Sequence, residues 1–126
     1  MMKLLESLKR VILREAVSRD SVSDAIRNKK VVTIYYAGDQ TINKGYREVE
    51  MVAFGPHKDS GNVVVRAWQT RGSSDTPENR PGWRLFRLDK INSISPTTET
   101  FDTPRPYFNP SDDKHMSQVF EIATFD

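Results

Sequence analysis

The chain of 126 residues contains no cysteine and only two histidines, His57 and His115, which lie far apart in the sequence. The absence of cysteine excludes disulfide bonds and thiolate metal sites, and it is compatible with a reducing compartment. No apolar run approaches the roughly 18 residues that would indicate a membrane span. Acidic residues interrupt the N-terminal apolar pattern, which does not resemble a signal peptide. We therefore expect a cytoplasmic protein with no membrane partner, no bound metal and no cofactor.

Signatures of catalysis are also missing. The sequence shows no nucleophile beside a base, no carboxylate cluster for a metal ion and no glycine-rich phosphate loop at a usable spacing. The composition, with 37% hydrophobic and 29% charged residues, is that of an ordinary globular protein. The length suits one domain with one core. We therefore predict a single non-enzymatic domain.

Charge is distributed unevenly, although the net charge is only +2. The first 30 residues carry eight lysines and arginines against four acids, whereas residues 96–126 carry two against six. Such asymmetry indicates an anionic partner for the first part and an acidic tail that opposes or gates it. The alternative is a solvated helix face followed by an acidic cap.

Helical periodicity is confined to the first part of the chain. Apolar residues of Leu4–Val17 recur at helical spacing, which predicts an amphipathic helix within an N-terminal segment of residues 1–20. A short second helix follows, with Ser21 or Ser23 as its expected cap.

The remaining residues, 21–126, read mainly as strands. The runs "VVTIYY", "YREVEMVAF", "NVVVRAW", "WRLFRL" and "INSIS" are β-branched, aromatic or alternating, and turn residues separate them. The last strand is expected to end at Pro96. Asp112 and Asp113, which follow Pro110, predict the first turn of a short C-terminal helix. The pattern thus predicts a mainly β fold with flanking helices, built on a small, strongly bent five-stranded barrel.

Arginines interrupt the apolar faces of three predicted strands. By alternation, Arg66 shares a face with Trp68, and Arg87 shares one with Trp83. By the same alternation, Arg47 shares a face with Val49, Met51 and Ala53. Since these positions lie near strand ends, we expect the arginines to meet at one anion site. The alternative is that each arginine pairs with a nearby carboxylate, for which Glu48, Glu50 and Asp89 are the candidates.

Guanidinium groups bind phosphates through two hydrogen bonds and stack on bases, so this face predicts an anionic or nucleic-acid ligand. Trp68 lies beside a polar loop and is the predicted stacking residue, whereas Trp83 is assigned to the core. A mixture of arginines and aromatic residues suits single strands or small nucleotides better than duplex DNA.

The segment "GWRLFRLDKI" after "VVVRAWQ", with "VVTIYY" and "YREVE" upstream and "FNPSDDKHM" downstream, resembles the WYL-domain family of bacteria and their phages. The resemblance covers roughly residues 21–120, although the Trp-Tyr-Leu triplet itself is absent. It implies an Sm-like, SH3-type small barrel that acts as a ligand-sensing or nucleic-acid-binding module. Carried over by position, Arg47, Arg66, Arg84 and Arg87 would line its basic groove.

The sequence therefore predicts a regulatory module that senses a ligand or binds single-stranded nucleic acid through a basic and aromatic groove. The predicted site residues are Arg47, Arg66, Trp68, Arg84 and Arg87. The alternative is a protein–protein interaction or oligomerisation module, which forms a homodimer or binds a partner protein through its N-terminal helix.

Overall fold

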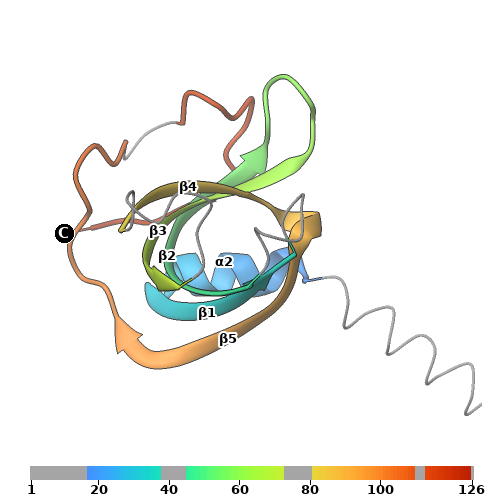
Figure 1. Cartoon of the computed structure of the whole chain (residues 1–126). Coiled ribbons are helices and arrows are strands. Elements are labelled where there is room, and N and C mark those ends of the chain that lie inside the picture. The colour runs from blue at the N-terminus through green and yellow to red at the C-terminus, as the bar shows by residue number, and fades with distance from the viewer. Residues whose placement is uncertain (1–16, 38–44, 73–80, 110–112, 126) are drawn as a thin grey trace, which may run out of the picture.

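The computed structural model describes residues 17–37, 45–72, 81–109 and 113–125. Most of the predicted N-terminal helix, residues 1–16, lies outside this part of the chain. The described elements are α2 (Arg19–Arg27), β1 (Lys30–Tyr36), β2 (Gly45–Pro56), β3 (Val63–Gly72), β4 (Gly82–Arg87), the 3-10 helix η3 (Leu88–Lys90), β5 (Ile91–Thr100) and β6 (Glu121–Ile122). Figure 1 shows the five long strands curving around a common centre.

The strands form one antiparallel sheet in the order β4-β3-β2-β1-β5, and the short β6 pairs with β2. The predicted fold class, mainly β with a helix and a strongly bent sheet, is confirmed. The sheet is not a closed barrel, however, because β4 and β5 are its two edges and are joined only through η3 in the described chain. Strand β5 also continues through Pro96, which was expected to end it. An edge strand tolerates proline because one side of its backbone needs no ladder hydrogen bonds.

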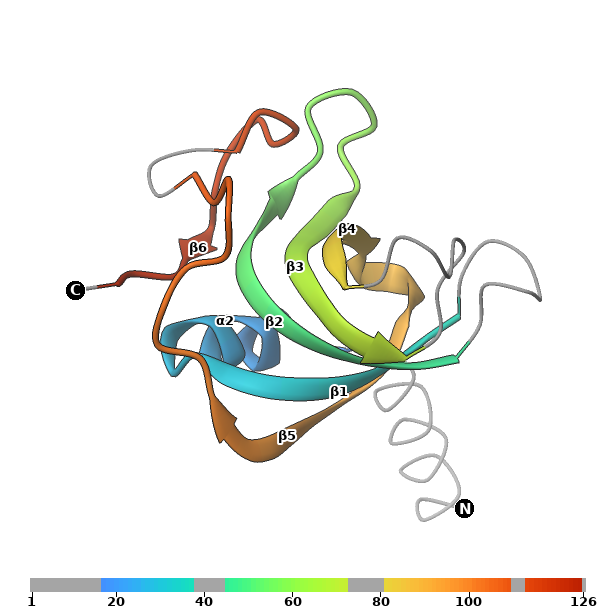
Figure 2. The same ribbon diagram turned by 60° about the vertical axis from the view of Figure 1, so that its left-hand side comes forward.

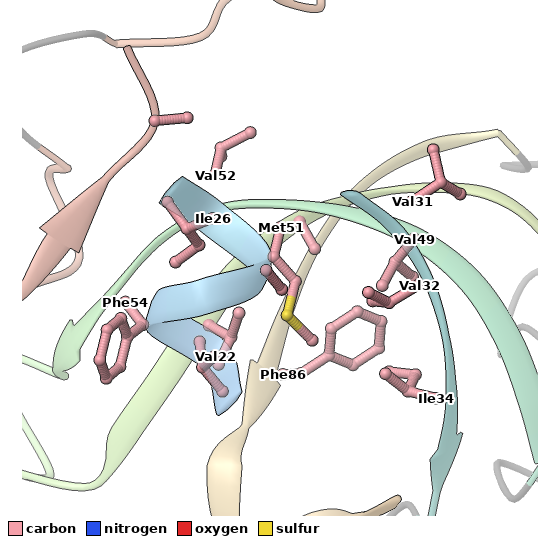
Figure 3. Packing of buried hydrophobic residues seen from close by; sticks show 14 of the residues in the cluster. Val22, Ile26, Val31, Val32, Ile34, Val49, Met51, Val52, Phe54 and Phe86 are labelled. Atoms are coloured by element: carbon pink, nitrogen blue, oxygen red, sulfur yellow. The ribbon is translucent and has the colours of Figure 1, made fainter. Parts of the chain in front are cut away.

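Helix α2 begins one turn earlier than the sequence suggested. Its cap is Ser18, whose hydroxyl oxygen accepts a hydrogen bond from the N–H of Ser21 at 3.1 Å. The predicted caps Ser21 and Ser23 lie inside the helix instead. The helix buries one face, formed by Val22, Ala25 and Ile26. In Figure 3, this face lies against side chains of β2, including Met51 and Phe54.

The main core fills the concave face of the sheet. Its central members come from all four strands β1–β4 and from the first residue of β5: Val32, Ile34, Val49, Met51, Val65, Ala67, Phe86 and Ile91 (Figure 3). A second, smaller cluster of Ala53, Val64 and Met116 lies on the outer face. The register of β2 against β3 shifts between Met51 and Ala53. The prediction that Ala53 shares a face with Arg47 is therefore wrong, because a bulge reverses the alternation between them.

The C-terminal tail, which we define as residues 101–109 and 113–125, covers the part of the outer face that β2–β4 form. Figure 2 shows it running from the end of β5 past α2 and back to β6 beside β2. The predicted C-terminal helix is wrong, since described residues 113–125 form turns, a bridge between Met116 and His57, and β6. In place of a helical turn, the carboxylate of Asp113 accepts a hydrogen bond from the N–H of His115 at 2.9 Å. Within the described residues, no helix is both long and apolar enough to cross a membrane.

Candidate ligand-binding site

A pocket of about 430 Å³ lies between the outer face of the sheet and the C-terminal tail. Its volume falls within the range of roughly 300–1,000 Å³ that is typical of small-molecule sites. We call it the tail pocket. The strands contribute Val52, Ala53, Arg66 and Trp83, and the tail contributes Tyr107, Phe108, Asn109, Asp113, Lys114 and His115.

Arg66 is the charged residue that the sheet contributes to the tail pocket. Its Nε lies 2.9 Å from Oδ2 of Asp113, and its Nη2 lies 3.3 Å from Oδ1 of the same carboxylate. Nη2 also lies 2.8 Å from Nδ1 of His115, which must accept the hydrogen bond because a guanidinium only donates. Within the described residues Nη1 makes no hydrogen bond. Arg66 therefore has two N–H donors available for a ligand in addition to the three contacts that position it.

The pKa values of the two tail residues that contact Arg66 are both lowered. Burial disfavours the charge of Asp113, but hydrogen bonds from Arg66 and from the N–H of His115 outweigh it, so the pKa of the carboxyl is lowered from 3.8. Burial and the positive charge of Arg66 lower the pKa of His115 from 6.5. At neutral pH the described residues that line the pocket therefore include the cations of Arg66 and Lys114 and the carboxylate of Asp113, a net positive set.

The aromatic residue that the strands contribute to the pocket is Trp83, which the sequence analysis assigned to the core and which also packs against the main core cluster. Its Nε1 donates to the carbonyl oxygen of Pro106 at 2.7 Å. Trp68, the predicted stacking residue, packs perpendicular to Trp83 with centroids 5.3 Å apart. The guanidinium of Arg105 covers the Trp68 ring at 5.4 Å and is itself held by two hydrogen bonds, of 3.0 and 2.7 Å, to the buried Glu50. Trp68 thus supports the tail and does not line the pocket.

The four predicted arginines do not meet at one site. Strand pairing places Arg66 and Arg87 on the outer face, opposite Leu85 and Val64 respectively. Arg84 lies opposite Ala67 and therefore belongs to the inner face. Arg87 is paired with Asp89 at 2.7 and 3.0 Å, as the alternative reading of the sequence proposed.

Arg47 is part of the core. Only 3% of it is exposed, and its guanidinium lies over the rings of Tyr36 and Phe86 at 5.1 and 5.4 Å. Its Nη1 donates to Oε1 of the buried Gln69 at 3.4 Å. Stacking on two aromatic faces stabilises a cation in an apolar setting. Of the four arginines and one tryptophan predicted as site residues, only Arg66 lines the tail pocket.

Sequence reasoning missed the residues that the tail contributes to the pocket. The segment "RPYFNPSDDKH" carries aromatic, acidic and basic residues between prolines. That mixture in a proline-rich stretch argues against a helix and indicates a loop of the kind that commonly holds functional residues. It was the available signal for a site in the tail.

Comparison with known proteins gives a match among solved structures. No protein-family model matches the sequence, and no curated protein matches it. Among solved structures, proteasome accessory factor B/C (PafBC) of Arthrobacter aurescens is similar, with a TM-score of 0.55 and 26% sequence identity. The match covers 71% of this chain but only 13% of that chain, so the present chain corresponds to a small part of PafBC. PafBC is a WYL-domain-containing regulator, and the likeness supports a WYL-like relationship.

Proposed function

We propose that this chain is a ligand-sensing regulatory module that binds a small anionic ligand in the tail pocket and catalyses no reaction. The observation that carries the proposal is the position of Arg66 in the pocket wall, beside Lys114 and the ring of Trp83. A guanidinium with two N–H groups available binds phosphate or carboxylate oxygens with directional hydrogen bonds. The net positive charge of the pocket attracts such a ligand.

The likeness to PafBC supports the regulatory part of the proposal, because it suggests a module that regulatory or ligand-sensing proteins use. The match spans a small fraction of PafBC, so the activity of the whole of that protein is not carried over to this chain. The alternative function, a protein-interaction or oligomerisation module, depends on the N-terminal helix that the sequence predicts, most of which lies outside the described residues.

A small ligand fits the geometry better than a long single strand of nucleic acid. Single-strand binding uses successive aromatic platforms along a basic groove. Here Arg105 covers Trp68, while Arg47 and Arg84 lie on the opposite face of the sheet from Arg66. The four predicted arginines are therefore divided between the two faces of the sheet and do not form one basic groove.

Calorimetric titration with two phosphate esters, ribose 5-phosphate and adenosine 5′-monophosphate, tests the proposal. We expect binding that weakens as the salt concentration rises. Lys114→Gln should lower the affinity about two- to fivefold, which is the range for an exposed charge contact. Lys30→Gln, which removes the same charge from β1, is the matched control and should leave the affinity unchanged. The proposal fails if neither ester binds, or if the two lysine variants behave alike.

Anisotropy measurements with labelled single-stranded DNA, single-stranded RNA and duplex DNA separate the small-ligand proposal from strand binding. A strand that contacts several cations binds with a steep salt dependence, about −0.7 per phosphate on a log–log plot. We expect a slope no steeper than the one that contacts with one or two phosphates would give. A slope that corresponds to many phosphates would favour the single-strand function and overturn the small-ligand one.

The Asp113 carboxylate and a bound anion would compete for the same guanidinium. Asp113→Asn removes the competing charge while it retains a similar shape. We therefore expect ribose 5-phosphate to bind this variant about fivefold more tightly or better, since about 1 kcal/mol is a modest value for a charged hydrogen bond. Unchanged or weaker binding would show that the anion does not reach Arg66.

A further inference from the structure

Residues Arg105–Phe108 form a tight turn at the rim of the tail pocket. The N–H of Phe108 donates to the carbonyl oxygen of Arg105 at 3.2 Å, and Pro106 and Tyr107 are the two central residues. Tyr107 has a φ of 68°. A proline followed by a residue with positive φ is characteristic of a type II turn, in which glycine is the usual third residue. Tyr107 therefore occupies a position where the backbone favours glycine and a bulky side chain is strained.

Packing does not offset this strain. The Tyr107 residue is 98% exposed, and within the described chain its ring contacts no other ring and its hydroxyl makes no hydrogen bond. In the described part of the chain, the two other large exposed hydrophobic residues differ in this respect. Tyr46 packs against Tyr35 at 4.9 Å, and Phe120 packs against Phe54 at 5.4 Å. The fold therefore gives no reason for an aromatic residue at position 107.

The residues on either side hold the turn firmly in place. Arg105 is fixed by its two hydrogen bonds to Glu50, and the carbonyl oxygen of Pro106 accepts the hydrogen bond from Trp83. Phe108 packs against Phe125 with ring centroids 5.4 Å apart. A rigid turn that presents one exposed ring beside a pocket is preorganised for binding.

We propose that Tyr107 is a stacking platform for a planar ring of the ligand, so that the ligand of the tail pocket is a nucleotide and not a simple phosphate ester. The inference rests on the proposed function. Arg66 and Lys114 provide contacts for the anionic group, and Tyr107 at the rim provides a face for the base. The other rings of the pocket are less available, because Trp83 packs against Trp68 and Phe108 packs against Phe125.

Two variants of the full chain isolate the ring from the backbone. Tyr107→Gly removes the ring and places the favoured residue at a positive φ, so the melting temperature should stay unchanged or rise. Tyr107→Phe keeps the ring and should keep the binding. Tyr46→Ala removes an exposed tyrosine from β2, away from the pocket, and is the matched control.

The readout is the ratio of affinities for adenosine 5′-monophosphate and ribose 5-phosphate, which differ by the base alone. The unmodified protein should prefer the nucleotide at least about fivefold, the lower limit for stacking of one base on an aromatic side chain. Tyr107→Gly should abolish this preference without changing the affinity for ribose 5-phosphate, whereas Tyr107→Phe and Tyr46→Ala should retain the preference.

The experiment distinguishes failure of the stacking inference from failure of the proposed function. If both esters bind equally, or if Tyr107→Gly keeps the preference, the stacking inference is overturned while the anion pocket stands. If neither ester binds, the proposed function and the inference fall together. A short oligoadenylate strand titrated in parallel identifies the source of the nucleotide. If the strand binds as tightly as adenosine 5′-monophosphate, a single nucleotide of the strand occupies the pocket. If the strand binds far more tightly, it also contacts the protein outside the pocket.

Discussion

Replacement of Arg66 by glutamine is expected to destabilise the folded protein, because it removes the guanidinium that neutralises Asp113. Only 20% of the Arg66 side chain and 10% of the Asp113 side chain are exposed. Removal of one partner of a fully buried pair costs roughly 3–5 kcal/mol, and an unsatisfied charge in a partly exposed setting costs about 1–3 kcal/mol. The intermediate burial of this pair places the loss of unfolding free energy at about 2 kcal/mol.

This loss converts into a measurable shift of the melting temperature. The entropy of unfolding is about 2.1 cal/mol/K per residue, which for a chain of 126 residues gives about 0.26 kcal/mol/K. A loss of about 2 kcal/mol therefore lowers the melting temperature by about 8 °C. The measurement is a thermal melt followed by circular dichroism at neutral pH.

A double-mutant cycle with Asp113→Asn identifies the partner. The double variant should be more stable than the sum of the single effects predicts, with a coupling of about 1–2 kcal/mol. Arg71→Gln breaks a more exposed pair with Glu48, in which 72% of the arginine side chain is exposed, and should shift stability by at most about 1 kcal/mol. If Arg66→Gln melts like Arg71→Gln, or if the cycle is additive, Asp113 does not hold Arg66 as the structure describes.

Three further outcomes are expected. Phe86→Ala should lower the unfolding free energy by about 3–5 kcal/mol in urea titrations, because Phe86 is 2% exposed at the centre of the core; a loss under 1 kcal/mol would contradict this position. Arg105→Gln should leave the buried Glu50 uncompensated at a cost of about 2–3 kcal/mol and uncover Trp68, which acrylamide quenching would detect as faster quenching of tryptophan fluorescence. Because burial and Arg66 lower the pKa of His115 in the folded state, the unfolded chain takes up the proton first as the pH falls below 6.5, so stability should decline there; His115→Gln should flatten that part of the stability–pH curve.

The strands were predictable because local sequence determines them. Runs of β-branched and aromatic residues at period 2 marked β1–β4 to within a few residues, and turn residues separated them. Three features depended on the rest of the fold. Pro96 lies within β5 because that strand is an edge, the bulge between Met51 and Ala53 reverses the alternation in β2, and Ser18 caps α2 one turn ahead of the predicted positions.

The site was less predictable because its residues come from distant parts of the chain. Sequence proximity suggested Glu48, Glu50 and Asp89 as partners for the arginines, and this holds for Arg87 with Asp89. The carboxylate that binds Arg66 lies 47 residues further along the chain, in a segment expected to be helical. No local pattern reveals such a contact, since it depends on how the tail crosses the sheet.

The tail explains why Arg66 and Trp68 occur on the outer face of β3, which is neither fully buried nor fully exposed. Since the tail covers the outer face of β2–β4, Arg66 and Trp68 there are half-buried, a setting that suits side chains with an apolar body and a polar end. Stability alone does not require an arginine at such a position, because well-packed apolar residues often replace a buried ion pair without loss or with a gain. We therefore propose that the Arg66–Asp113 pair serves recognition of the ligand in addition to its contribution to stability. Under the proposed function, the Asp113 carboxylate orients the guanidinium for an anion, and the same carboxylate sets how strongly a ligand must bind to occupy the site.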